Sequence, residues 1–142
     1  MALEFFVQEI DFTLDKEDSV KDWILFIASS EGFQLAGINY IFCSDPYLLA
    51  LNRTHLDHDY FTDILTFPYH EPGAIALAAD IYISIDRVGE NADSFHTGFD
   101  NELHRVMIHG LLHLMGYDDH DEAERQAMRQ AEEKALAQRA FA

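Results

Sequence analysis

The alternation of apolar and polar positions along the chain predicts strands interleaved with helices. Short apolar runs rich in β-branched and aromatic residues predict four strands, at residues 3–12, 37–43, 64–67 and 80–85. Apolar positions at helical spacing predict helices over residues 19–29, 45–52, 101–115 and 122–140. The sequence shows no repeat, linker or low-complexity segment. We therefore expect one α/β (α+β) domain over residues 1–142, in which a small mixed four-stranded sheet packs with about five helices.

Two of the predicted helices differ in how their apolar residues are distributed. The helix at 101–115 is apolar almost all round, which indicates a central place in the core. The helix at 122–140 carries a single stripe of small apolar residues, while its charges alternate in sign. That charge pattern is typical of a solvated face. The residues in it are Glu122, Glu124, Arg125, Arg129, Glu132, Glu133, Lys134 and Arg139.

Composition and the first residues of the chain indicate the cellular compartment. The chain has 142 residues, and 49% of them are hydrophobic, which suffices for a core without disulfides. The only cysteine, Cys43, lies in an apolar run, so we expect a buried thiol and a reducing compartment. The first residues lack the basic start of a signal peptide, and no apolar run reaches membrane-spanning length. We expect a cytoplasmic protein without a membrane partner.

The charge balance narrows the nucleic-acid partners. Lys and Arg total 9 against 26 Asp and Glu, a net charge of -17. Such a surface argues against broad, charge-driven adhesion to nucleic acid, and we expect no DNA partner. A local basic cleft remains compatible with it.

The most informative chemistry lies at residues 109–120, HGLLHLMGYDDH. His109 and His113 are four residues apart and project from one face of the central helix, close enough to bind one ion. Gly116 can end the helix and return a third ligand, from Asp118, Asp119 or His120. Each histidine could instead bind a backbone carbonyl, but two uncompensated histidines in an apolar helix would be costly. The pattern therefore predicts one zinc ion per chain, with a position open for water.

The same segment resembles the HGxLHLxGYDH signature of the YbeY family, bacterial metal-dependent endoribonucleases implicated in ribosomal RNA maturation. Residues 51–68, LNRTHLDHDYFTDILTFP, are similar to that family's LN segment and TDVLSFP-like strand, and residues 79–84, ADIYIS, to its GDIxIS strand. The resemblance implies a single α/β domain, a zinc ion and action on ribosomal RNA of the small subunit. It also suggests a ribosome-associated GTPase or a ribosomal protein as a partner.

The chain departs from the family pattern at the third ligand. Counting from His109, the family's third histidine corresponds to Asp119, and His120 follows one step later. The spacing favours Asp119, whose carboxylate can bind zinc at nearly the same distance as an imidazole. The residue type favours His120. Asp119 could instead cap the last helix, since Asp119 and Glu122 have capping-box spacing, as do Asp121 and Glu124.

A second departure concerns the basic residue that the family places after the LN pair, where this chain has Leu56. Arg105, one turn before His109, is the preferred substitute for contact with a phosphate, and the alternative is an ion pair with Glu102. The resemblance gives Asp63 a polar role in the cleft, against the alternative that it bonds to its own backbone.

These residues predict a hydrolase. Zinc would lower the pKa of a bound water and polarise a phosphoryl oxygen, which suits hydrolytic cleavage of a phosphodiester. The resemblance implies that the substrate is RNA and that the cleavage belongs to ribosomal RNA processing. We expect unpaired RNA, because a shallow cleft with few basic residues holds an exposed backbone more readily than a duplex. A ribosome-assembly factor with a purely structural zinc is the main alternative. A zinc protease is disfavoured, because Gly110 stands where such enzymes carry the general-base glutamate.

Overall fold

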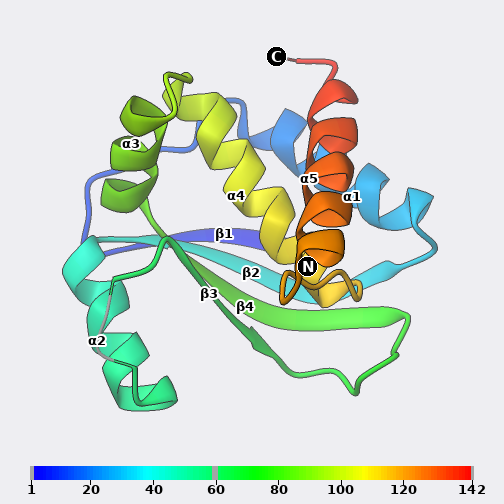
Figure 1. Ribbon diagram of the computed structural model, residues 1–142, viewed down its shortest axis with the longest axis horizontal. Helices are drawn as coiled ribbons and strands as arrows, with labels where there is room; N and C mark the ends of the chain where they lie inside the picture. The colour runs from blue at the N-terminus through cyan, green and yellow to red at the C-terminus, as the bar shows by residue number, and fades with distance from the viewer. Residues whose placement is uncertain (1, 59–60, 142) are drawn as a thin grey trace.

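The strands form one mixed sheet, shown in the computed structural model of Figure 1, which describes residues 2–58 and 61–141. Over these residues the four strands are β1 (Leu3–Gln8), β2 (Gln34–Cys43), β3 (Ile64–Pro68) and β4 (Ala76–Ser84), in the order β1-β2-β4-β3. β1 and β4 run parallel to β2, whereas β3 is antiparallel to β4. The predicted first strand was too long, because Glu9 takes a positive φ of 60° and ends β1 at Gln8.

Within the described residues the chain forms five helices, as predicted. They are α1 (Glu17–Ser30), α2 (Asp45–Leu56), α3 (Ile85–Ser94), α4 (Phe99–Leu114) and α5 (Glu122–Ala137). The individual helix predictions had missed α3, whose polar composition concealed it. Ser84 caps this helix by accepting a hydrogen bond from the Arg87 N–H, and only Val88 and Ala92, four residues apart, are buried. One apolar residue per turn is a weak periodic signal.

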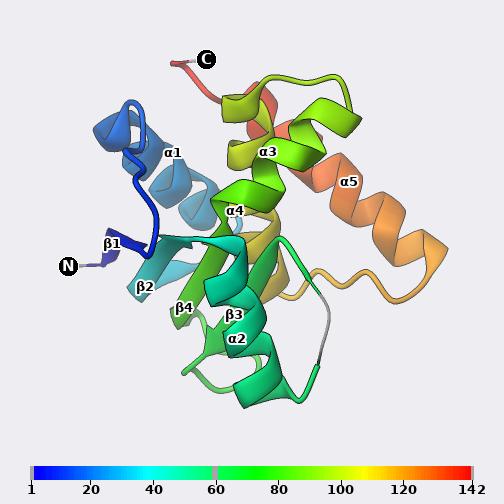
Figure 2. The same cartoon turned by 90° about the vertical axis from the view of Figure 1, so that its left-hand side faces the viewer.

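The helices cover the two faces of the sheet unequally. Figures 1 and 2 show α1, α4 and α5 on one side and α2 on the other. The main core lies on the side of α4, where Ile38, Ile81 and Leu111 are fully buried. The smaller cluster beneath α2 contains Cys43, which is buried as predicted. No helix in the described part of the chain is long and apolar enough to cross a membrane.

The predicted central place of α4 is confirmed by its burial and by its close approach to the sheet. Nine of its residues are buried, and the hydroxyl of the buried Tyr40 donates to the Met107 carbonyl at 2.9 Å. A Cβ at Gly110 would lie only 2.8 Å from Ile64 Cδ1 and 3.3 Å from Ile81 Cγ2. Glycine therefore lets α4 rest directly on β3 and β4, which brings His109 and His113 to the edge of the sheet.

Candidate metal centre

A cleft of about 580 Å³ runs between the end of α2, strand β3, helix α4 and the loop after α4. It brings together side chains that lie far apart in the sequence. The residues lining it are Asn52, Leu56, His58, Thr62, Asp63, Ile64, Leu65, Thr66, His109, Gly110, His113, Asp119 and His120. All four predicted metal ligands and Asp63 therefore face one space, whereas Arg105 does not line it.

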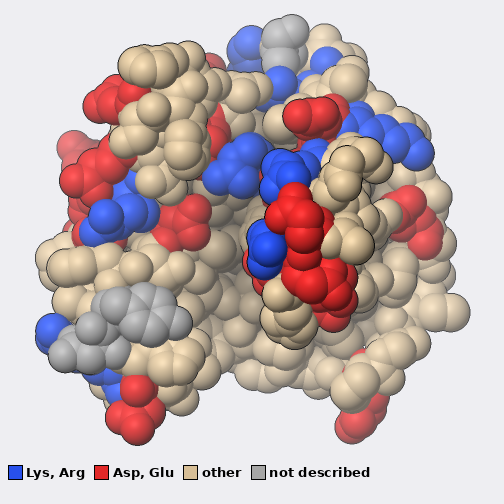
Figure 3. Space-filling view, in the orientation of Figure 1, with Lys and Arg blue, Asp and Glu red and all other residues tan. Residues whose placement is uncertain are grey.

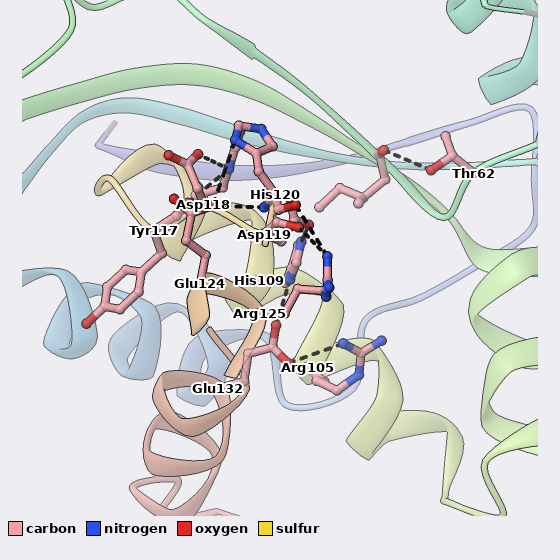
Figure 4. A network of polar contacts seen from close by, with 12 residues as sticks. Thr62, Arg105, His109, Tyr117, Asp118, Asp119, His120, Glu124, Arg125 and Glu132 are labelled. Atoms are coloured by element: carbon pink, nitrogen blue, oxygen red, sulfur yellow. Dashed lines mark hydrogen bonds and ion pairs between the residues drawn. The ribbon is translucent and has the colours of Figure 1, made fainter. Parts of the chain in front are cut away.

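His109 is oriented by a buried carboxylate. Its Nδ1 lies 2.6 Å from Glu132 Oε2, and Glu132 is only 4% exposed (Figure 4). A carboxylate only accepts hydrogen bonds, so Nδ1 carries the hydrogen and Nε2 of the neutral ring keeps its lone pair. The free Nε2 lies 3.9 Å from Asp119 Oδ2. The contact with Glu132 also raises the pKa of His109, against the effect of burial.

His113 reaches the same state through the backbone. Its Nδ1 lies 3.1 Å from the Tyr117 carbonyl oxygen, which also only accepts. The carbonyl is within reach because Gly116 takes a φ of 107° and reverses the chain after α4, as the sequence had predicted. In both histidines, Nδ1 is thus hydrogen-bonded to protein and Nε2 is left as the ligand atom, the arrangement typical of histidines that bind a metal.

The two candidates for the third ligand sit differently. Asp119 points toward His109, whereas the His120 side chain is 78% exposed with Nδ1 3.9 Å from Glu124 Oε1. Among the described residues, the compact grouping of possible ligand atoms is Asp118, His120 and Glu124, within 4.8 Å of one another. Glu124, however, already accepts hydrogen bonds from the backbone N–H groups of His120 and Asp121, at 3.0 and 3.3 Å.

Helix capping separates Asp119 from its neighbours. The N-cap of α5 is Asp121, and its capping box with Glu124 has both hydrogen bonds. The interpretation of Asp119 as the cap of this helix is therefore wrong. Arg125 holds the preceding loop through the carbonyls of Asp119 and His120, at 3.4 and 3.5 Å, which leaves the Asp119 carboxylate facing the cleft.

Arg105 forms the ion pair that was the alternative to a phosphate contact. Its Nε and Nη2 donate to Glu102 at 2.9 and 2.5 Å, and its Nη1 donates to Glu132 at 3.3 Å. These carboxylates raise the pKa of the guanidinium, which therefore stays charged. Arg105 belongs to the network behind His109, and 30% of its side chain remains exposed.

Asp63 lies in the cleft at the start of β3. Burial raises the pKa of its carboxyl group, against the attraction of Arg105 and His109. Asn91 Nδ2 donates to it at 3.4 Å, and its backbone carbonyl accepts from the Ser84 N–H at 2.9 Å. A hydrogen bond from its own backbone N–H, the predicted alternative, is among the causes that lower its pKa. A carboxyl group with a raised pKa in a cleft is suited to proton transfer.

Glu132 is the residue that the sequence interpretation missed. The alternating charges of the last helix placed it on a solvated face, but it is buried against His109 and Arg105. The other charged residues of that pattern within α5 are exposed or half-buried. A signal existed, because Glu132 lies four residues after Met128 and three before Ala135, both buried. A charged residue in phase with an apolar stripe marks a paired internal group.

Comparisons with known proteins agree with this geometry. A family model described as "Endoribonuclease YbeY" matches residues 5–140. A protein of that name from Parabacteroides distasonis is 44% identical over 137 residues, covering 96% of this chain and 95% of its own. Another from Flavobacterium psychrophilum is 47% identical over 131 residues, covering 92% of each chain.

A solved structure shares the fold. The solution structure of TM1509 from Thermotoga maritima superimposes with a TM-score of 0.66 at 28% sequence identity, covering 94% of this chain and 86% of the other. The predicted family and the mixed α/β fold are both confirmed. The family model covers nearly the whole chain, and the matches to these two relatives cover 96% and 92% of it, so this protein belongs to the endoribonuclease YbeY family.

Proposed function

We propose that this protein is a zinc-dependent endoribonuclease that cuts unpaired RNA during maturation of ribosomal RNA in the small subunit. The observation that carries the proposal is the matched state of the two histidines. His109 and His113 each give Nδ1 to an acceptor and leave Nε2 as the ligand atom at one cleft. The family name supports RNA as the substrate.

The ligand set that we propose is His109, His113 and Asp119. Asp119 stands at the position of the family's third histidine, ten residues after His109. Its Oδ2 lies 3.9 Å from His109 Nε2. His120 belongs to the alternative grouping with Asp118 and Glu124, in which Glu124 is committed to the cap of α5. Two nitrogens and one carboxylate oxygen form a donor set that zinc accepts.

The remaining residues would handle the RNA. A bound zinc ion would act as a Lewis acid and would lower the pKa of a bound water. Asp63, whose pKa is raised by burial, would accept or donate a proton at the scissile phosphate. Arg105 has two N–H groups beyond those bound to Glu102 and Glu132, and we propose that they contact a phosphate oxygen.

The surface around the site fits a modest affinity for RNA. Figure 3 shows acidic side chains spread over this face, and near its middle, where α4 and α5 lie, a few Lys and Arg side chains directly beside a cluster of acidic ones. A short basic region can hold a single strand by a few phosphates without attracting nucleic acid generally. We propose a cytoplasmic location and, as partners, a ribosome-associated GTPase or a ribosomal protein.

The test is cleavage of a small-subunit RNA fragment by the zinc-loaded protein. We expect His109→Ala to cleave at below about one hundredth of the parent rate, because only two ligands remain. Arg105→Ala should be slower than the parent, and His55→Ala, which changes an exposed histidine of α2, should match the parent. Cleavage at the parent rate by folded His109→Ala would refute the enzyme.

Chelation distinguishes the enzyme from an assembly factor with a structural zinc. The core around α4 is built from apolar residues and does not depend on the cleft. We therefore expect a chelator to abolish cleavage while the circular dichroism spectrum persists. Unfolding on chelation would favour the assembly factor.

A further inference from the structure

Three charged side chains are packed together behind His109. Glu102 and Glu132 are 1% and 4% exposed, and Arg105 lies between them with hydrogen bonds to both. Buried ion pairs of this kind are often no more stable than apolar residues of the same volume, since each charge loses its hydration. Stability alone therefore does not account for this arrangement.

The chain of contacts ends at the metal centre. Glu132 Oε1 accepts from Arg105 Nη1 at 3.3 Å, and Glu132 Oε2 accepts from His109 Nδ1 at 2.6 Å. Arg105 is in turn held by the fork of Glu102 at 2.9 and 2.5 Å. Figure 4 shows Glu132 between Arg105 and His109, reaching from α5 to α4. Each carboxylate oxygen of Glu132 has its own partner, so neither Glu132 nor the His109 ring can rotate without losing a contact.

We infer that Glu132 is a positioning residue of the metal centre. Held by Arg105 and Glu102, it keeps the hydrogen of His109 on Nδ1 and directs the lone pair of Nε2 into the cleft toward Asp119. The inference rests on the proposed zinc ligands. His113 Nδ1 is hydrogen-bonded to the backbone carbonyl of Tyr117, and the Asp118 carboxylate lies farther away, at 3.7 Å. Of the two histidines, His109 is therefore the one whose tautomer is set by a hydrogen bond to a side chain.

Glu132→Gln is the sharpest variant, because it keeps the volume and reverses one hydrogen bond. The Arg105 donors need an oxygen, so the amide NH₂ group is left to face His109. An NH₂ group donates, which moves the hydrogen of His109 from Nδ1 to Nε2 and blocks the ligand atom. We expect zinc affinity to fall about 10- to 100-fold. Glu133→Gln makes the same charge change at an exposed position of α5 and should bind zinc like the parent.

Two measurements separate positioning from a general effect on the fold. Zinc affinity is measured by competition with a chelating dye. The tautomer of His109 is read from ¹⁵N shifts of the ring nitrogens in the zinc-free protein, with folding checked by circular dichroism. We expect hydrogen on Nδ1 in the parent and in Glu133→Gln, and hydrogen on Nε2 in Glu132→Gln.

An unchanged tautomer in Glu132→Gln, with or without a loss of affinity, would overturn the inference. If Glu132→Gln does not fold, Glu132→Asp replaces it, because its shorter carboxylate falls short of His109. Parent-level zinc affinity in that variant would equally overturn the inference. A wrong ligand set would give a different result. His109→Ala would then keep its zinc, while the tautomer of His109 in the zinc-free parent would still report the contact with Glu132.

Discussion

Two histidines of helix α4, His104 and His109, have partners on α5 or just after it, and their rings are opposite tautomers. At the cleft, His109 Nδ1 donates to the Glu132 carboxylate, and Nε2 remains available. Five residues earlier, His104 Nδ1 accepts from Arg139 Nη1 at 2.9 Å. His104 is 6% exposed and lies between the rings of Trp23 and Phe141, with centroids at 5.7 and 5.5 Å.

The difference shows how the partner decides the function of a histidine. An acceptor at Nδ1 prepares the ring to bind a metal through Nε2. Burial, together with a cationic donor at Nδ1, disfavours the charged ring, and the pKa of His104 is lowered to about 4. His104 is therefore a neutral structural residue, although it lies on the same helix as the proposed ligands.

The largest expected effect is on metal content. We expect the purified parent to hold about one zinc ion per monomer and His109→Ala or His113→Ala to hold almost none, since two ligands are too few. His104→Ala should keep its zinc and lose stability instead. Elemental analysis of the dialysed proteins measures this. Stoichiometric zinc in His113→Ala would refute the site.

The next effect concerns the third ligand. Asp119→Ala should weaken zinc binding by about 10-fold or more, because its carboxylate faces His109 Nε2, whereas His120→Ala should have less effect. Competition titrations with a chelating dye compare the two, and thermal unfolding controls for the fold. Release of zinc by His120→Ala, with Asp119→Ala still binding like the parent, would assign the ligand to His120.

The pH dependence of stability tests the environment of His104. The unfolded chain takes up a proton on this histidine below its ordinary pKa of 6.5, whereas the folded protein does so only near pH 4. The free energy of unfolding should therefore fall by about 2 to 3 kcal/mol from this residue as the pH drops through that window. Urea unfolding at pH 7 and pH 4.5 should show a smaller loss for His104→Gln than for the parent. His96→Asn, at an exposed histidine, should follow the parent.

The smallest expected effect is that of salt on RNA binding at the cleft. With few arginines near the site and a net charge of -17, the protein can neutralise few phosphates, so added salt should weaken binding only slightly. Affinities for a single-stranded RNA at several salt concentrations, measured with a catalytically silent His109→Ala protein, give the slope. A slope as steep as that of a basic RNA-binding domain would contradict this view of the cleft.

The sequence by itself determined most of the fold and the identity of the metal-binding helix. His109, His113 and Gly116 belong to one local segment, and their relation follows from helix geometry and from the left-handed turn at Gly116. The strands were predictable for the same reason, although α3 was missed and the ends of several elements shifted by a few residues. Local patterns are readable because the interactions behind them are local.

Only the tertiary structure decided which state each histidine takes. Glu132 lies 23 residues after His109 in the sequence, and Arg139 lies 35 residues after His104. Residues so far apart in the sequence form no periodic pattern from which either pairing could be predicted. The packing of α5 against α4 brings a carboxylate to one histidine and a guanidinium to the other. Which partner arrives depends on how two helices dock, and that is settled by the apolar contacts of the whole core rather than by the residues around either histidine.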